Sequence, residues 1–281
     1  MEITDLKYEK RDAVAWICID RPARRNALGD ATTRQMAYVC QDAADDPAVK
    51  VLVITGSGDD AFCSGGDIQD TFQRGQHMSE QQWSDRIRNG PNVLTRLLQS
   101  TDKPVIAAIN GVAVGGGTTI ALACDLRIAS DRARFCLPFA RVGLTPEFGC
   151  SYLLQRVVGL GRAMELLLLG EFIDAAVAER YGLVNRVVEH RNLSQTTLEV
   201  AQRLVSLPAA ALARVKQLQR FARFNDLEAT LEQEAVSLGR SFTSVEHRAA
   251  VDQFLNHRSS RSSRVADGRE IRAQQTTHTR R

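Results

Sequence analysis

The segment from Val105 to Cys124 constrains the fold most, because it holds twenty consecutive residues without a charged side chain. A membrane-spanning helix needs about 20 mostly apolar residues, so the length alone fits a membrane span. Asn110 and four glycines, three of them consecutive at 115–117, disfavour one continuous helix. A buried strand over 105–109, a glycine-rich turn and a buried helix over 117–124 explain the pattern better. We therefore expect a soluble protein without a membrane partner.

The net charge of +3 comes from the C-terminal end of the chain. Residues 258–281 contain seven arginines against Asp267 and Glu270, so this tail carries +5 and the preceding 257 residues carry −2. The tail is rich in Arg, Ser and Thr and lacks apolar periodicity, which predicts a disordered basic tail. A slightly acidic body disfavours nucleic acid as a partner, and leaves RNA or DNA binding by the tail as a minor alternative.

The cysteines and the familiar motifs narrow the class of protein further. None of the six cysteines forms a C-x-x-C pair, and most lie among apolar residues, as in a reducing compartment. The charged N-terminus does not resemble a signal peptide, so we expect a cytoplasmic protein. Cysteine and histidine spacing predicts no metal site. The sequence lacks G-x-G-x-x-G after a strand, G-x-x-x-x-G-K-[ST] and G-x-S-x-G, which disfavours a nucleotide-dependent enzyme and a serine hydrolase.

Strand and helix patterns alternate along residues 1–192, which predicts an α/β core with mainly parallel, buried strands. The polar segment 69–78 predicts a mobile loop, and residues 193–257 show only helical patterns. The predicted strands cover 13–20, 49–55, 105–109, 125–129 and 183–188. The predicted helices cover 32–44, 80–99, 117–124, 150–158, 162–169, 174–181, 194–206, 209–222, 227–241 and 244–256.

Two glycine-rich turns are each linked to a buried strand. The first covers Phe62–Ile68 after strand 49–55, and the second covers Asn110–Gly117 after strand 105–109. Glycine-rich turns expose backbone N–H groups and let a ligand approach closely. Two such turns at neighbouring strand ends can each aim one N–H at the same oxygen, which is how an oxyanion hole is built. Either turn alone is better explained by ordinary turn chemistry.

Together the two turns belong to a longer pattern that resembles the crotonase (enoyl-CoA hydratase/isomerase) superfamily, and its isomerase-like members in particular. The motifs occur in family order over about residues 4–257. They are Arg21-Pro22 with Asn26-Ala27-Leu28, Phe62-Cys63-Ser64-Gly65-Gly66-Asp67-Ile68, Lys103 to Gly111, Gly115-Gly116-Gly117, Ala123 to Ala129, Gly143-Leu144-Thr145-Pro146 and Tyr181-Gly182-Leu183-Val184.

The resemblance implies a ClpP-like spiral of ββα repeats over 1–192, a helical trimerisation region over 193–257, and homotrimers or homohexamers. It implies an acyl-CoA thioester as substrate, with CoA as part of the substrate and no separate cofactor. It places the thioester oxygen on the N–H groups of Gly66 and Gly116. The residues that it places beside the substrate are Arg24, Asn26, Ala27, Leu28, Ser64, Asp67, Ile68, Thr119, Phe139 and Leu144. Arg24 and Arg25 suit CoA phosphates, although solvated surface charge explains them equally well.

The sequence departs from the hydratases of this family at both catalytic glutamates. The first glutamate position, two residues after the glycine run, is Thr119, and the second, after Pro138, is Phe139. Neither side chain can relay a proton as a carboxylate does, so hydration through paired carboxylates is doubtful.

Glu147 occupies the position where the isomerases of this family carry their single catalytic acid. After Pro146, Glu147 is expected to begin a helix, where the helix dipole alone would also favour a glutamate. Apolar neighbours such as Phe139, Leu144 and Phe148 predict a raised pKa for its carboxyl.

These residues predict an isomerase that shifts a 3-enoyl-CoA double bond to the 2-trans position with Glu147 as the one base. The alternatives are an enoyl-CoA hydratase or another crotonase-fold acyl-CoA enzyme, and a non-catalytic acyl-CoA-binding scaffold.

Overall fold

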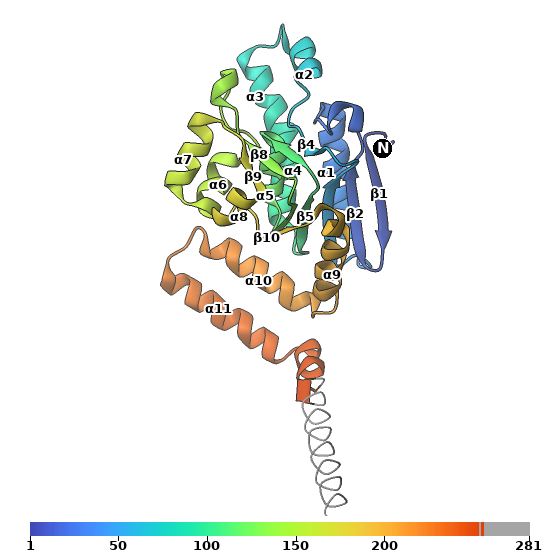
Figure 1. The fold of residues 1–281 in the computed structure, drawn as a ribbon. Coiled ribbons are helices and arrows are strands. Elements are labelled where there is room, and N and C mark those ends of the chain that lie inside the picture. The colour runs from blue at the N-terminus through green and yellow to red at the C-terminus, as the bar shows by residue number, and fades with distance from the viewer. Residues whose placement is uncertain (253, 256–281) are drawn as a thin grey trace, which may run out of the picture. The chain divides into compact units, whose positions relative to one another are not determined.

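A six-stranded sheet forms the centre of the fold (Figure 1). The computed structural model describes residues 1–252, 254 and 255, apart from the side chains of residues 72 and 74, so the predicted tail 258–281 lies outside the described residues. The strand order is β1-β2-β3-β5-β7-β10, and all neighbours are parallel except β1 and β2. These strands are β1 (Leu6–Arg11), β2 (Val14–Ile19), β3 (Val51–Gly56), β5 (Val105–Ile109), β7 (Leu126–Ser130) and β10 (Arg186–Val188).

Alternate residues of the central strands pack on opposite faces of this sheet. In β3, Leu52 and Ile54 belong to the larger buried cluster, whereas Val51 and Val53 belong to a second cluster on the other face. Helix α9 (Leu193–Val205) covers the second face. Because both faces are covered, strands such as β5 are apolar throughout, which explains why their sequences lack alternation.

A second sheet holds four short strands in the order β4-β6-β8-β9. These strands are β4 (Ala61–Cys63), β6 (Val112–Val114), β8 (Arg134–Cys136) and β9 (Ile173–Asp174). Strands β4, β6 and β8 are parallel to one another, and β9 is antiparallel to β8. Because β4 follows β3 and β6 follows β5, the two predicted turns lie beside each other at this sheet.

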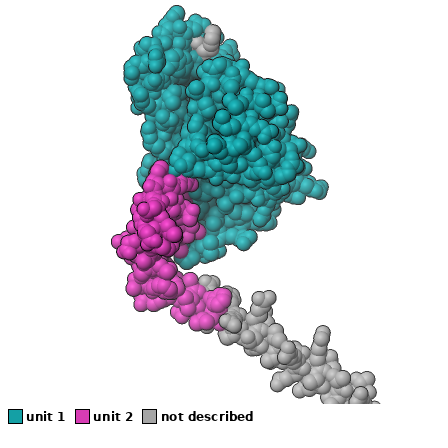
Figure 2. Space-filling view, turned by 90° about the vertical axis from the view of Figure 1, so that its left-hand side faces the viewer, with its two compact units in different colours: residues 1–209 teal, residues 210–281 magenta. Residues whose placement is uncertain are grey.

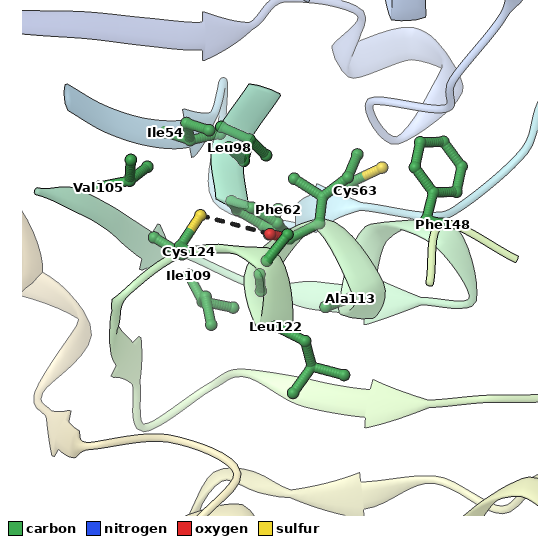
Figure 3. Close-up of a cluster of buried hydrophobic side chains, with 14 of the residues drawn as sticks. Ile54, Phe62, Cys63, Leu98, Val105, Ile109, Ala113, Leu122, Cys124 and Phe148 are labelled. Atoms are coloured by element: carbon green, nitrogen blue, oxygen red, sulfur yellow. Dashed lines mark hydrogen bonds between the residues drawn. The ribbon is translucent and has the colours of Figure 1, made fainter. Parts of the chain in front are cut away.

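The core has several helices, most of which contribute residues to the larger buried cluster. Figure 3 shows part of this cluster around Phe62, Ile109 and Cys124. A hydrogen bond from the Cys124 thiol to the Ile120 carbonyl, 3.3 Å long, lies within it. These helices are α1 (Asp30–Asp45), α2 (Ile68–Gly75), α3 (Glu80–Asn89), α4 (Pro91–Ser100), α5 (Gly116–Ala123), α6 (Cys150–Val158), α7 (Leu160–Leu169) and α8 (Ala175–Arg180). Short 3-10 turns cover Pro22–Arg24, Ala140–Val142 and His190–Asn192.

Three sequence predictions were wrong in detail. The predicted loop 69–78 is mostly helix α2, whose first turn is capped by Asp67. The single helix predicted over 80–99 is broken at Gly90, because Pro91 cannot continue a helix and instead begins α4. Strand β1 was not predicted, because its sequence is charged. A turn at Asp12 and Ala13, both with positive φ, joins β1 to β2 in a hairpin.

Contacts divide the chain into two compact units, residues 1–209 and 210–281, which Figure 2 draws in different colours. The first unit includes α9, together with the start of α10 (Ala209–Ala222). In the second unit, α10 and α11 (Leu227–Phe242) are joined by a hydrogen bond from Arg214 to Ser241. The α/β core and the helical C-terminal region are therefore confirmed, while a role of that region in trimers stays a prediction. No helix in the described residues has the length and apolarity needed to cross a membrane.

Gly117→Ala tests whether the stability of the fold depends on the close approach of α5 to β4. A Cβ at Gly117 would collide with the backbone carbonyl of Cys63, which cannot move without breaking β4. We expect a loss of about 1–3 kcal/mol in the free energy of unfolding. Gly161→Ala is the control, because its Cβ meets no atom within 4 Å, and helix propensity predicts a gain of up to about 1 kcal/mol. Equal stabilities of the two variants in urea would contradict the prediction.

Candidate active site

The two glycine turns meet where β4 and β6 end. Gly65 has a φ of 90°, and a Cβ there would lie 2.7 Å from the carbonyl oxygen of Val114 and 3.7 Å from the nitrogen of Gly116. Gly115 has a φ of 52°, a conformation that side chains rarely adopt. The glycines are therefore required by positive φ and by close backbone contact, and they bring the two turns together as predicted.

The N–H of Gly66 points away from Leu28, whose backbone holds the first turn in place. Leu28 pairs with Gly66 in an isolated parallel bridge, in which Leu28 N–H donates to Gly65 O at 2.8 Å and Asp67 N–H donates to Leu28 O at 2.9 Å. In a parallel bridge these bonds use the residues on either side of Gly66, so its own N–H faces the opposite direction. A Cβ at Gly66 would meet no atom within 4 Å, so the space around it is open.

The N–H of Gly116 is available for a different reason. Gly116 is the first residue of α5, and the first four N–H groups of an α-helix have no acceptor within the helix. The helix dipole adds partial positive charge at this end. Gly66 and Gly116 thus supply two backbone donors from neighbouring turns, the arrangement that stabilises an oxyanion.

Glu147 lies directly beside Gly116. Its Oε1 is 3.3 Å from the place that a Cβ would occupy on Gly116, and the ring of Phe148 is as close as 2.9 Å to the same point. The segment is fixed by hydrogen bonds from Thr95 Oγ1 to Phe148 O (2.9 Å) and from Cys150 N–H to Glu147 O (2.9 Å). Glu147 itself precedes α6, which begins at Cys150, because Phe148 and Gly149 both have positive φ. The expectation that Glu147 begins a helix was therefore wrong, whereas the helix predicted over 150–158 was confirmed.

Burial raises the pKa of the Glu147 carboxyl above its ordinary value, and the positive charge of Arg86 opposes that rise. Phe148 and Phe139 are buried around this region, and the Phe139 ring lies 3.7 Å from the place of a Cβ on Gly115. Leu144 is 64% exposed and so contributes little to the burial. The direction predicted for this pKa is confirmed, with Phe148 as the main apolar contact at Gly116.

Thr119 cannot substitute for a carboxylate. Its side chain is fully buried, and its hydroxyl donates to Gly115 O at 3.1 Å inside α5. Thr119 and Phe139, the two positions at which the family's hydratases carry glutamates, therefore add no proton-transfer group to the pair of N–H donors. Glu147 is the carboxylate that the fold places there.

The residues expected at CoA lie together, since the loop before α1 is hydrogen-bonded to the first glycine turn. Ser64 N–H donates to Arg25 O at 3.0 Å, and Arg21 binds Asp67 at 3.0 Å. Asp67 also accepts from Asp70 N–H at the start of α2, so its side chain holds the loop. These contacts join Arg24, Asn26, Ala27 and Leu28 to Ser64, Asp67 and Ile68.

These loop residues differ in what they leave open to a ligand. Asn26 is fully buried. Its side-chain amide donates to Ser57 O and Ala61 O, and its Oδ1 accepts from Arg21 N–H. Ala27 and Leu28 are also buried. Ile68 is 76% exposed, and Arg24 is exposed with one hydrogen bond to Gln69. Arg24 and Ile68 are thus accessible, whereas Asn26 shapes the loop.

Arg21 and Arg86 are the site residues that sequence reasoning missed. Arg21 lies within the Arg-Pro motif, and only the fold shows that it binds Asp67 and Ala27 O. Arg86 belongs to no motif, and its electrostatic effect on Glu147 could be found only from tertiary structure.

The comparisons with known proteins agree with this geometry. The sequence profile described as "Enoyl-CoA hydratase/isomerase" matches residues 9–262, and the chain belongs to this family. It is 36% identical over 260 residues to the short-chain-enoyl-CoA hydratase of Clostridium acetobutylicum, covering 92% of this chain and 97% of that protein. It is 34% identical over 246 residues to the 1,2-epoxyphenylacetyl-CoA isomerase of Escherichia coli, covering 88% and 93%.

A crystal structure of an enoyl-CoA hydratase/isomerase from Cupriavidus metallidurans superposes with a TM-score of 0.85 at 32% identity, covering 92% of this chain and 95% of that one. The protein thus has the crotonase fold and is an acyl-CoA enzyme of that superfamily. Hydratases and an isomerase both occur among its relatives, so the comparisons support the superfamily as a whole and do not support the predicted closeness to its isomerase-like members.

Glu147→Gln should change stability in a pH-dependent way. Folding raises the pKa of the Glu147 carboxyl. The favourable contribution of this carboxyl to the free energy of unfolding is therefore complete below its ordinary pKa of 4.5, and it is lost as the pH rises through the pKa of the folded state. The uncharged glutamine should therefore raise the free energy of unfolding at about pH 7, and the gain should disappear at about pH 4. Guanidinium unfolding at both pH values measures this. Glu165→Gln, at an exposed position of α7, should change little at either pH, and a pH-independent effect of Glu147→Gln would refute the prediction.

Proposed function

We propose that this enzyme shifts the double bond of a 3-enoyl-CoA to the 2-trans position, with Glu147 as the only proton carrier. The observation that carries the proposal is the Glu147 carboxylate, whose Oε1 is 3.3 Å from the place of a Cβ on Gly116, beside the two glycine turns. A site with one carboxylate and an oxyanion hole suits the transfer of one proton between two carbons of one substrate.

The reaction needs only groups that the chain supplies. The Glu147 carboxylate removes a proton from C2, and the C2–H electron pair forms a dienolate whose oxygen is bound by the N–H groups of Gly66 and Gly116. The protonated Glu147 then delivers the same proton to C4. The C3–C4 double bond is lost, a C2–C3 double bond forms, and Glu147 returns to its ionised state.

The raised pKa of Glu147 fits this cycle, in which the same group acts first as base and then as acid. A group that both accepts and donates a proton works best when its pKa lies near the working pH. Burial moves the pKa of the carboxyl toward that range, and the positive charge of Arg86 opposes part of the rise. The open side of Gly66 and the exposed Ile68 and Arg24 leave room for the CoA portion beside the same turn.

Hydration of a 2-enoyl-CoA is the second candidate, and the comparisons favour it over isomerisation. Relatives at 36% identity, from Clostridium acetobutylicum and Syntrophomonas wolfei, are named hydratases. Hydration here would require Glu147 to activate water without the second glutamate, since that position is Phe139. An acyl-CoA-binding scaffold without turnover is the remaining alternative.

Paired assays of the wild type and of Glu147→Gln separate these functions. We expect wild-type protein to isomerise 3-hexenoyl-CoA faster than it hydrates crotonyl-CoA, both measured on the same preparation. The variant should lose about 10²–10⁴-fold in kcat for isomerisation, the usual contribution of a general acid–base, while still binding acyl-CoA. Faster hydration by the wild type would support the second candidate. Binding without turnover of either substrate would support the scaffold.

Gly116→Pro removes one oxyanion donor while leaving the helix start intact, because proline is tolerated at the first helical position. Gly116→Ala is the matched control, since it adds a Cβ against the Phe148 ring but keeps the N–H. We expect the proline variant to have a kcat about 10²–10³-fold below that of the alanine variant. Similar kcat values for the two folded variants would show that the Gly116 N–H does not bind the enolate.

A further inference from the structure

Glu147 lies in a connection whose own backbone hydrogen bonds are local. Residues 145–149 join the 3-10 turn Ala140–Val142 to α6. Cys150 N–H donates to Glu147 O at 2.9 Å, and Gly149 O accepts at 3.0 Å from two N–H groups of the same helix. These bonds attach the connection to the first turn of α6. They leave the direction of the Glu147 side chain to be set by other contacts.

The connection also holds two residues in the left-handed region. Phe148 has a φ of 53° and Gly149 has a φ of 80°. Glycine adopts such angles freely, but phenylalanine is disfavoured there because its Cβ crowds the following carbonyl oxygen. A backbone of this kind persists only where its surroundings hold it. One restraint is the Phe148 ring, which is 2% exposed and lies as close as 2.9 Å to the place of a Cβ on Gly116.

The second restraint is the hydroxyl of Thr95 in α4. Its Oγ1 lies 2.9 Å from Phe148 O, and this is, among the described residues, the hydrogen bond that ties residues 145–149 to an element distant in the chain. The same hydroxyl lies 3.2 Å from Pro91 O, four residues earlier in its own helix. A hydroxyl has one proton, and the shorter distance favours Phe148 O as the acceptor. The Cγ2 of Thr95 is also 3.3 Å from the place of a Cβ on Gly149.

Helix α4 gives Thr95 a fixed base. Leu94 and Leu98, one residue before Thr95 and three residues after it, are 0% and 1% exposed and belong to the larger buried cluster. A functional side chain on a packed helix is placed more precisely than one on a loop. Thr95 can therefore fix the connection that carries Glu147 relative to the core.

We propose that Thr95 is a positioning residue for Glu147, whose hydroxyl fixes the carbonyl of Phe148 and thereby keeps the Glu147 carboxylate beside the two glycine turns. The inference rests on the proposed function, in which that carboxylate exchanges a proton with C2 and C4. Because Glu147 and Phe148 share a peptide bond, a rotation at Phe148 moves the carboxylate. A misplacement of about 1 Å in a catalytic group can lower kcat by about 10²-fold.

Thr95→Val tests the inference, because valine matches threonine in shape and lacks the hydroxyl. With 3-hexenoyl-CoA as substrate, we expect kcat to fall by about 10–10²-fold with little change in KM. Thr95→Ser keeps the hydroxyl and should retain most of the wild-type kcat. In a Glu147→Gln background, Thr95→Val should change the residual kcat by less than about 2-fold, because the carboxylate that Thr95 positions is absent. Where valine prevents folding, Thr95→Ala removes the same hydroxyl and favours the helix.

The titration of Glu147 supplies a second readout that needs no turnover. Burial raises the pKa of its carboxyl and the charge of Arg86 opposes that rise, so a carboxylate released from its place should have a lower pKa as it becomes more exposed. The carboxyl NMR signal of labelled Glu147, assigned by its absence in Glu147→Gln, should titrate at lower pH in Thr95→Val than in the wild type or Thr95→Ser. Ser100→Ala, which removes an exposed hydroxyl from α4, should change neither kcat nor the titration.

A wild-type kcat and an unchanged Glu147 titration in Thr95→Val would overturn the inference and leave the proposed function standing. An equal loss of kcat in Thr95→Val and Thr95→Ser, or the same fold-loss in the Glu147→Gln background, would also overturn it, because the effect would then not pass from the hydroxyl to the carboxylate. If the wild type does not isomerise 3-hexenoyl-CoA, the proposed function fails. The titration then decides alone, since a lower pH in Thr95→Val supports the positioning role and an unchanged one overturns it.

Discussion

The rest of the site depends on one backbone contact, the close approach of Gly117 to the carbonyl of Cys63. Any side chain at Gly117 would push α5 away from β4, and the N–H of Gly116 would then move away from that of Gly66. The contact is possible because Gly65 and Gly115 adopt positive φ on either side of it. Two turns that are fifty residues apart in the chain are thereby fixed as one pair of donors.

The side chains around this pair differ in what they add to the site. Glu147 is half-buried with Phe148 beside it, and the positive charge of Arg86 opposes the rise that burial causes in its pKa. Thr119, which turns its hydroxyl inward to Gly115, adds no second base. In the proposed function, a proton moves within this site between one carboxyl and a bound carbon acid, and backbone dipoles hold the developing negative charge.

Much of the fold could be predicted because buried strands and glycine turns leave strong local signals. Strand β5 was predicted with the observed limits, and α5 and α6 to within a residue. The elements that were missed have weak signals. Strand β1 is charged because one side faces solvent, and β8 and β9 are only three and two residues long. The break at Gly90 was missed because the apolar spacing of α3 and α4 continues across it.

The sequence by itself determined the two glycine turns, the absence of a carboxylate at Thr119 and Phe139 and the presence of Glu147 after Pro146, because each is a property of neighbouring residues in fixed spacing. Only the tertiary structure decided which groups meet. It brought Glu147 to Gly116, tied Arg21 to Asp67 and set Arg86 between Asp30 and Trp83. These contacts join residues distant in the chain, and their geometry follows from how helices pack over the sheets, which no local spacing encodes.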